Sequence, residues 1–391
     1  MATRRVAITG LGVISAAGSS AEAFWNGLLA PQPEGERRVN GFDPTPHFDN
    51  PKEARRADRF TQFALAASDQ ALAQAGDLAT DPTRIGTWVG TGVGGIATLE
   101  EQIVIRHERG EKRVSPFLVP MMMANAAAGT ISIRKGFEGP CENTVTACAA
   151  GTQSIGNAAR LIQTGRCDVV VTGGSEASMT PTAIAGFTNM TALSSSGYSR
   201  PFDRDRDGFV ISEAAGILVL EEWDHAIARG APILAEILGS ASTADAYHLT
   251  APAPGGTGAV RCIELALADA GLGAADIVHV NAHGTSTPLN DATEAEALHK
   301  VFGAPGPLVT STKGVTGHAL GAAGAIEAIA VVLTMHHRLI PPTAGTVNLD
   351  PDIAPVNLVY GEPRPWTPGP TISNSFGFGG HNACLVIAPV S

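Results

Sequence analysis

The sequence predicts an α/β protein made of two similar layered halves, and three observations support this prediction. Strand-like runs of β-branched residues alternate with helix-like segments along the whole chain. The same order of elements occurs in residues 1–232 and again in residues 233–391, as a pattern rather than an identity. The 391 residues are 44% hydrophobic and only 16% charged, which favours a thick core or a large subunit interface.

The first half opens with a strand at 4–10, where two arginines lead into a β-branched run that ends in glycine. A helix is expected at 58–76, because apolar residues recur there at helical spacing and a glycine closes the pattern. The remaining elements are strands at 84–92, 142–148, 167–174 and 214–222 and a helix at 149–165. Residues 31–60 are polar and rich in proline and charge, which predicts a surface excursion.

The second half repeats this order of elements. Its expected elements are strands at 233–242, 276–286 and 308–318, helices at 258–271 and 321–337, and a closing hairpin at 371–389. When the halves are matched, the strand–helix junction around Cys148 corresponds to the junction around His318. Because corresponding strand ends meet in such α/β folds, we expect these two side chains to lie close together.

Charge and cysteine content exclude several classes of protein. The net charge of −11 argues against nucleic-acid binding. No apolar run approaches the roughly 18 residues of a membrane span, and the N-terminus (MATRRVAITGLGVIS) does not resemble a signal peptide. We therefore expect a cytoplasmic protein without membrane association. In a reducing compartment, five scattered cysteines without a CxxC pair argue against disulfides and zinc.

Cys148, in the stretch VTACAAG, is placed to act as a nucleophile. It stands where a strand is expected to run into the helix 149–165. The free N–H groups at a helix N-terminus stabilise a thiolate and can bind a developing oxyanion. A buried structural cysteine is the alternative, and position alone leaves both interpretations open. The other four cysteines lie within strand or helix patterns and are interpreted as structural.

His283 and His318 occupy matching positions in the second half. Each stands by a glycine turn near the end of a buried strand, where its side chain can point into a cleft. Two N–H donors on one oxygen can stabilise an enolate or hold a carboxylate that is about to leave. Lys313 and Glu327 could orient and tune His318, although a solvated or paired charge explains either residue alone.

Two glycine-rich loops and a pair of threonines complete the candidate features. SFGFGG (375–380) fits a mobile lid or a source of backbone N–H donors better than a dinucleotide-binding loop, because it does not join a first strand to a helix. TGVGG (91–95) is not interpreted as a phosphate-binding loop. Thr285 and Thr287 are turn hydroxyls that could also bond the amides of a pantetheine arm.

Five motifs in order give the chain a family resemblance: VTACAAG, RDGFV, NAHGTSTPLND, STKGVTGHALGAAGAIE and SNSFGFGGHN. Together they resemble the β-ketoacyl-ACP synthases of the thiolase superfamily, closest to the synthase I/II type, over nearly the whole chain. The resemblance implies a thiolase-like fold of two pseudo-twofold halves layered α/β/α/β/α. The Cys-His-His set differs from the Cys-His-Asn of synthase III relatives and the Cys-His-Cys of thiolases.

The resemblance implies covalent catalysis in two half-reactions. Cys148 would accept an acyl chain from an acyl carrier protein, with its own N–H and that of Phe378 as the oxyanion hole. His283 and His318 would bind the malonyl thioester and promote decarboxylation, and Lys313 and Glu327 would support His318. The substrates would be carried on phosphopantetheine, with no metal and no redox cofactor.

The resemblance also assigns binding residues. Phe378 would gate the acyl pocket, and Thr285 and Thr287 would line the pantetheine channel. Further substrate contacts are expected from Phe376, Val93 and Leu118. Basic residues for docking the acidic carrier protein are expected at Lys52, Arg55, Arg56, Lys112 and Arg113. For these basic residues, a solvated helix face is an equally good explanation.

Three functions are compatible with this resemblance. The first is a fatty-acid elongating synthase that acts as a homodimer, to which residues 121–129 could contribute an interface. The second is the ketosynthase subunit of a type II polyketide or polyene system with a chain-length-factor partner. The motif TACAAG resembles the fatty-acid type and favours the first function, whereas trimmed loops and Thr191, where many relatives have an arginine, point toward the second. The third is a non-catalytic subunit, against which the intact Cys148, His283 and His318 argue strongly.

Overall fold

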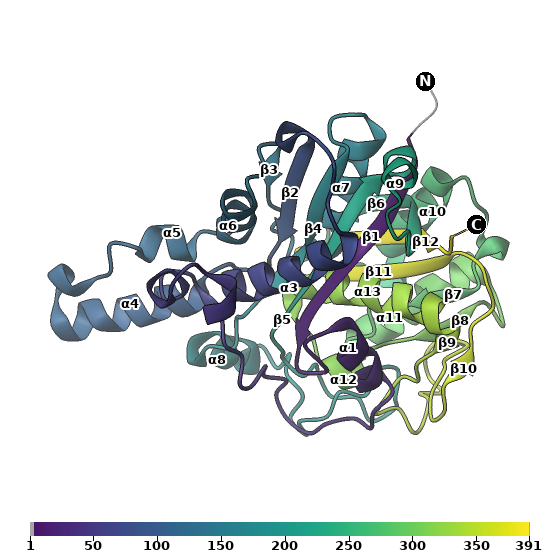
Figure 1. Cartoon of the computed structure of the whole chain (residues 1–391). Helices are drawn as coiled ribbons and strands as arrows, with labels where there is room; N and C mark the ends of the chain where they lie inside the picture. The colour runs from purple at the N-terminus through teal and green to yellow at the C-terminus, as the bar shows by residue number, and fades with distance from the viewer. Residues whose placement is uncertain (1–3, 391) are drawn as a thin grey trace.

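The computed structural model describes residues 4–390 and has the layered α/β architecture that the sequence predicts (Figure 1). The strands are β1 (Val6–Ser15), β2 (Ile85–Gly90), β3 (Cys141–Glu142), β4 (Val169–Glu176), β5 (Ala214–Glu222), β6 (Ala235–Ala244), β7 (His279–Asn281), β8 (Leu308–Thr310), β9 (Leu339–Ile340), β10 (Arg364–Pro365), β11 (Thr371–Gly377) and β12 (His381–Ala388). The helices are α1 (Ala21–Leu28), α2 (Pro51–Ala54), α3 (Arg59–Ala75), α4 (Ile96–Arg109), α5 (Leu118–Met122), α6 (Ala126–Lys135), α7 (Ala150–Gln163), α8 (Pro181–Asn189), α9 (Trp223–Arg229), α10 (Thr257–Ala270), α11 (Pro288–Phe302), α12 (Lys313–Thr316) and α13 (Ala323–His337).

The main sheet has an internal symmetry. Its strand order is β3-β2-β4-β5-β1-β6-β12-β11-β7-β8. From either edge inward, the pairs run parallel, parallel, antiparallel, antiparallel, and β1 and β6 meet antiparallel in the middle over three residue pairs. The predicted boundary at residue 232 falls between α9 and β6 and stays a prediction.

The helices form three layers around the two halves of this sheet. Helices α7 and α13 contact each other and strands of both halves, so they form the central layer. Helix α3 covers the outer face of the first half together with α6, and α10 covers that of the second half together with α11 (Figure 1). Ile155 of α7 and Ile329 of α13 are fully buried in the central core. The resulting order is α/β/α/β/α, and it places the N-termini of α7 and α13 side by side.

Three of the predicted strands are much shorter than expected. The segments 142–148, 276–286 and 308–318 keep only the short strands β3, β7 and β8. After each strand the chain is rich in threonine, serine and glycine, which favour turns over strand pairing. The released residues form the turns that carry Cys148, His283 and His318. By contrast, the closing hairpin of β11 and β12 is confirmed.

Two further expectations need correction. Within the described chain, the segment Leu320–His337 is long and apolar enough to cross a membrane, but 89% of it is buried inside the molecule as the central helix. The segment 31–60 is not only a surface excursion, because Arg37 and Asp58 are buried within it. The sequence predicts no signal peptide at the N-terminus, and residues 1–3 of that segment lie outside the described residues.

Candidate active site

Cys148 lies on a tight turn at the start of the central helix α7. It is the middle residue of a 3-10 turn, Ala147–Ala149, that runs into α7. Ala147 has φ 48°, a left-handed conformation that is strained for a residue with a side chain. The strain indicates that the surroundings hold this turn in place. The sulfur points into the cavity between the two halves.

The environment of Cys148 balances burial against hydrogen bonding. Burial raises the pKa of the thiol to about 11, and the negative charge of Glu176 acts in the same direction. The backbone N–H groups of Phe378 and of Cys148 itself, together with the charge of Lys313, oppose this rise in pKa. The backbone N–H groups thus lower the thiol pKa in the expected direction, but desolvation is the larger effect and the pKa is raised overall.

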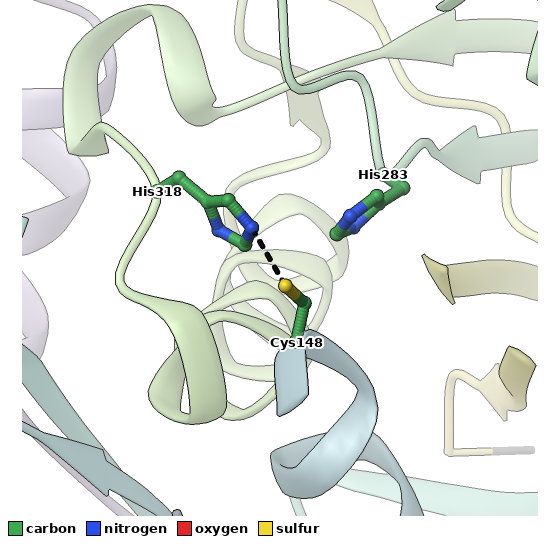
Figure 2. Close-up of side chains that lie close together, drawn as sticks. All are labelled: Cys148, His283 and His318. Atoms are coloured by element: carbon green, nitrogen blue, oxygen red, sulfur yellow. Dashed lines mark hydrogen bonds between the residues drawn. The ribbon is translucent and has the colours of Figure 1, made fainter. Parts of the chain in front are cut away.

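His318 is the hydrogen-bond partner of Cys148. Its Nε2 lies 3.0 Å from Cys148 Sγ (Figure 2). Its backbone N–H donates to the carbonyl of Val210 at 2.7 Å, and its carbonyl accepts from Ser212 at 3.1 Å. The ring of Phe209 packs edge-on against the imidazole, with centroids 5.2 Å apart. The motif RDGFV thus packs against the His318 ring and accepts its backbone N–H.

His283 faces the same point from the end of β7. Its ring stands at 84° to that of His318, with centroids 5.3 Å apart (Figure 2). Lys313 Nζ donates to the carbonyl of His283 at 2.6 Å and lies 3.3 Å from its Nδ1. Because an ammonium group only donates, Nδ1 of His283 is an acceptor and its proton is on Nε2. His283 is therefore set up as an N–H donor toward Cys148.

This contact corrects the orienting role predicted for Lys313, whose charge nevertheless lowers the pKa of His318 as the predicted tuning requires. Lys313 bonds His283 rather than His318, and its ammonium also forms a buried ion pair with Glu327. The two residues lie on α12 and α13, and their side chains extend toward β7. The sequence distance to His318 was a poor guide because the tight bend at Gly317 turns His318 away from Lys313.

Both imidazoles are neutral at physiological pH. Burial and the nearby Lys313 charge hold the pKa of His283 and of His318 well below the usual histidine range. A neutral imidazole can accept the proton of the Cys148 thiol or donate N–H to a carbonyl oxygen. The site therefore has one nucleophile, one adjacent base and two potential donors.

Two buried acids that the sequence analysis missed hold the turn after His283. Glu294 accepts the N–H groups of His283 and Gly284 at 2.8 and 2.7 Å, and burial raises its pKa to about 7. Asp291 accepts the N–H groups of Ser286 at 3.2 Å and of Phe202 at 2.7 Å. Their spacing of three residues on α11, directly after the HGTST turn, is the signal that could have revealed them.

The glycine loop between β11 and β12 brings a backbone donor to the thiol. A side chain on Gly377 would begin 3.0 Å from the backbone nitrogen of Cys148, so glycine allows the loop to approach this closely. The next N–H, that of Phe378, then reaches Cys148. With the N–H of Cys148, it forms the donor pair expected of an oxyanion hole.

A cavity of about 420 Å³ opens onto these groups. Cys148, His283 and His318 line it. The predicted substrate residues that also line it are Val93, Thr285, Thr287, Phe376 and Phe378. The predicted contact Leu118 begins α5 and is not among the lining residues. Residues that the sequence analysis missed also line it, among them Phe187, Met190, Phe209 and Leu320.

The three central side chains could also be considered as metal ligands. Cys148, His283 and His318 offer ligand atoms that lie within 4.8 Å of one another. His318 Nε2 is hydrogen-bonded to the sulfur, and Nδ1 of His283 faces an ammonium group. These pairings suit proton transfer and N–H donation, so the prediction of a metal-free site stays the simpler interpretation.

The predicted docking residues are exposed and come from two segments that meet. Lys52, Arg55 and Arg56 belong to α2 and the turn after it, and Lys112 and Arg113 follow α4. The guanidinium of Arg56 lies 4.3 Å from the ring centre of Phe117, four residues after Arg113. This contact joins the two segments, and we refer to these five basic residues as the basic patch.

The chain matches two family models. The model described as "Beta-ketoacyl synthase, N-terminal domain" covers residues 3–226, and "Beta-ketoacyl synthase, C-terminal domain" covers residues 234–347. A 3-oxoacyl-[acyl-carrier-protein] synthase 2 from Synechocystis sp. is 45% identical over 98% of this chain and 97% of its own. The enzyme of the same name from Staphylococcus aureus strain N315 is 43% identical over 98% of both chains.

Solved structures agree with this assignment. The ishigamide ketosynthase/chain length factor superposes with a TM-score of 0.93 at 33% identity and covers 100% of both chains. A type II PKS ketosynthase, solved in complex with its acyl-carrier protein, gives a TM-score of 0.89 at 31% identity, again over 100% of both chains. These matches span the whole chain and its catalytic motifs. The chain therefore belongs to the β-ketoacyl synthase family.

Proposed function

We propose that this protein is a 3-oxoacyl-[acyl-carrier-protein] synthase that joins a malonyl unit to a Cys148-bound acyl chain in fatty-acid elongation. The observation that carries the proposal is the contact of Cys148 Sγ with His318 Nε2 at 3.0 Å, with His283 facing the same point. Relatives that are 45% and 43% identical over nearly their whole length carry this activity in their names.

The first half-reaction is acyl transfer. His318 takes the thiol proton as Cys148 Sγ attacks the carbonyl carbon of the acyl thioester. The carbonyl oxygen becomes an oxyanion that the N–H groups of Cys148 and Phe378 stabilise. The C–S bond to the carrier then breaks, and His318 returns the proton to the departing pantetheine thiol.

The second half-reaction is decarboxylation and condensation. His318 ends the first half-reaction with Nε2 unprotonated, so its remaining proton moves from Nδ1 to Nε2 before the malonyl thioester binds. The Nε2–H groups of His283 and His318 then bond the carbonyl oxygen of the malonyl thioester. The C–C bond to the carboxylate breaks, carbon dioxide leaves and an enolate forms under these two donors. The enolate carbon attacks the acyl carbonyl on Cys148. The new C–C bond replaces the C–S bond, and the released thiolate takes a proton from solvent.

Acyl carrier protein is the proposed partner, and the substrates arrive on its phosphopantetheine arm. The basic patch would attract the acidic carrier, and Thr285 and Thr287 would bond the amides of the arm in the cavity. Phe378 would gate access to the acyl chain. No metal or redox cofactor takes part in the steps above, and we place the protein in the cytoplasm, where fatty-acid synthesis draws on soluble carriers.

We propose a homodimer as the working form. Large apolar side chains are exposed along α4, α5 and α6, and α6 adjoins the edge strand β3. Ile133 of α6 is 82% exposed and Val119 of α5 is 57% exposed. An edge strand with unpaired backbone groups beside an apolar surface is an arrangement that a second chain can cover.

Any contact of Leu118 with substrate stays a prediction.

A second candidate is the ketosynthase subunit of a type II polyketide system. Solved ketosynthases of that kind superpose well on this chain, and one of them is described with a chain length factor. The higher identity to the 3-oxoacyl-ACP synthases favours elongation of fatty acids. In the polyketide case, condensation would require a second, similar chain.

The test is mass spectrometry of the purified protein after mixing with acyl carrier proteins that bear saturated chains of different lengths. We expect one covalent acyl group per chain, lost in Cys148→Ala, and condensation with malonyl carrier protein in the absence of any other chain. Acylation without condensation would favour the polyketide alternative. Condensation that survives in Cys148→Ala would contradict the mechanism.

A further inference from the structure

Arg37 is a buried cation that the steps above do not use. Its side chain is 2% exposed. The guanidinium donates to the backbone carbonyls of Pro33, Gly35, Gly314 and Val315. Its hydrogen-bond partners within the described residues are thus all carbonyl oxygens, without a carboxylate. Because burying a charge is unfavourable unless the surroundings compensate it, these contacts require an explanation.

Two of the carbonyls belong to the turn that carries both Lys313 and His318. Arg37 Nε donates to the carbonyl of Val315 at 3.1 Å, and Nη2 lies 3.4 Å from that of Gly314. Both carbonyls are in α12, a single turn between Lys313 and His318. The last carbonyls of a helix have no partner within it and carry partial negative charge. Arg37 supplies the missing donors and a compensating positive charge.

The backbone of Arg37 is tied to the segment that also clamps His318. The N–H of Arg37 donates to the carbonyl of Ile211 at 3.1 Å. The N–H of His318 donates to the carbonyl of Val210 at 2.7 Å. Arg37 and His318 therefore both lie beside the extended segment 210–213. Arg37 pairs with Ser212 and His318 pairs with Ile211, each as an isolated parallel β-bridge.

The aliphatic stem of Arg37 fixes the peptide just before His318. Gly317 has φ 66°, and a side chain there would begin 2.8 Å from Cγ of Arg37. The bend at Gly317 is thus filled by the arginine stem. The guanidinium of Arg37 thus bonds the carbonyls of Gly314 and Val315, and its aliphatic chain packs against Gly317.

We propose that Arg37 is a positioning residue that fixes the 313–318 turn, so that His318 meets Cys148 while Lys313 meets His283. This inference rests on the proposed condensing function. Arginine suits the role because its planar fork reaches several carbonyls at once, whereas the lysine ammonium is a single point of donation. Displacing a reacting group by about 1 Å can lower a rate by about a hundredfold.

The experiment compares Arg37→Gln, Arg37→Lys and a control, Arg229→Gln, in the full-length protein. Arg229 is also largely buried and also donates to backbone carbonyls, those of Ala75 and Asp77, but far along the chain from the catalytic turns. We measure kcat and KM for decarboxylation of malonyl carrier protein, the rate of Cys148 alkylation by iodoacetamide, and the thermal midpoint.

For Arg37→Gln we expect kcat to fall at least about tenfold with KM nearly unchanged. Arg37→Lys should recover part of this loss, and Arg229→Gln should lower only the thermal midpoint. A kcat of Arg37→Gln within about twofold of the parent would overturn the proposal. If Arg37→Gln does not fold, the same kcat criterion is applied to Arg37→Lys.

The alkylation rate separates failure of this inference from failure of the proposed function. A parent protein that does not decarboxylate malonyl thioesters contradicts the function. The contact of Cys148 with His318 can still be tested in that case, because it requires no substrate. Slower Cys148 alkylation in Arg37→Gln, with an unchanged rate in Arg229→Gln, would support the positioning role, and equal rates would overturn it.

Discussion

Cys148 depends on a neighbour for its reactivity. A helix N-terminus usually favours a thiolate, but here burial raises the thiol pKa to about 11. The thiol therefore stays protonated near neutral pH, and His318 Nε2 at 3.0 Å provides the base that removes the proton. We therefore expect the proton to be transferred only when an acyl thioester binds.

The first residue-scale prediction concerns pH. Because the folded-state thiol pKa is raised, the thiolate fraction should keep growing as pH rises from 7 to 10. The alkylation rate of Cys148 by iodoacetamide should rise over this whole range. The reaction is followed by mass spectrometry, and the Cys148→Ala variant identifies the signal that comes from Cys148. A rate that levels off below pH 8 would show that the thiol pKa is low and contradict this account.

The second residue-scale prediction concerns Glu176. This fully buried carboxylate accepts the N–H groups of Gly92 at 2.6 Å and Gly321 at 3.1 Å, and its charge raises the Cys148 pKa. We expect Glu176→Gln to lower that pKa and speed alkylation at pH 8 several-fold. Its thermal midpoint should fall, because a buried N–H that loses its acceptor costs about 1–3 kcal/mol.

Glu213→Gln is the matched control for Glu176→Gln. Glu213 is also buried, but it pairs with Arg59 and accepts the N–H of Val39. The Glu213→Gln protein should lose stability and keep the parent alkylation rate. Equal alkylation rates in both variants would mean that the Glu176 charge does not act on Cys148.

At the scale of elements, the site is built from turns rather than from strands. Segments 142–148, 276–286 and 308–318 leave the sheet after two or three residues, and their freed backbone groups bind buried side chains. Glu294 from α11 and Arg37 from the 31–60 segment are two such side chains. Short strands with firmly held turns place the reactive atoms of Cys148, His283 and His318 within 4.8 Å of one another.

The element-scale prediction concerns the basic patch. Reversing two of its charges, in Lys112→Glu/Arg113→Glu, should raise KM for carrier-bound substrate about tenfold at low salt, because charge complementarity mainly accelerates association. The kcat for a free pantetheine thioester should stay the same. Lys300→Glu on α11 is the control, and an equal rise in KM there would show a nonspecific effect of net charge.

At the scale of the whole molecule, two similar halves close over a shared helical layer. The order of parallel and antiparallel strand pairs is the same from both edges of the sheet, and α7 and α13 occupy matching places between its halves. The symmetry brings Cys148 of the first half to His318 and His283 of the second. The active site therefore depends on the packing of the halves, and neither half contains the complete set.

The whole-molecule prediction is that the protein is a dimer in solution. Light scattering should give the mass of two chains, and Ile133→Asp, which places a charge on the exposed apolar surface of α6, should shift it toward one chain. Leu265→Asp on α10 is the control, since Leu265 is 48% exposed on the far layer. A parent protein with the mass of one chain would contradict the proposed homodimer and would favour a requirement for a second, different subunit.

The sequence by itself predicted the layered fold class, a repeat of two halves and, through its family resemblance, Cys148, His283 and His318 as the candidate site. These features are local: hydrophobic period, turn residues and short motifs are read within a few neighbours of each position. The same reasoning located the glycine loop that brings the Phe378 N–H to the thiol.

Only the tertiary structure decided which buried charges meet. Lys313 bonds His283 and not the nearby His318, Glu294 holds the turn after His283, and Arg37 reaches Gly314 and Val315 from 277 or more positions away. The thiol pKa was likewise decided by burial, which no local pattern reports. Partners far apart in the chain are fixed by packing, and a desolvated charge takes whichever partner that packing brings within reach.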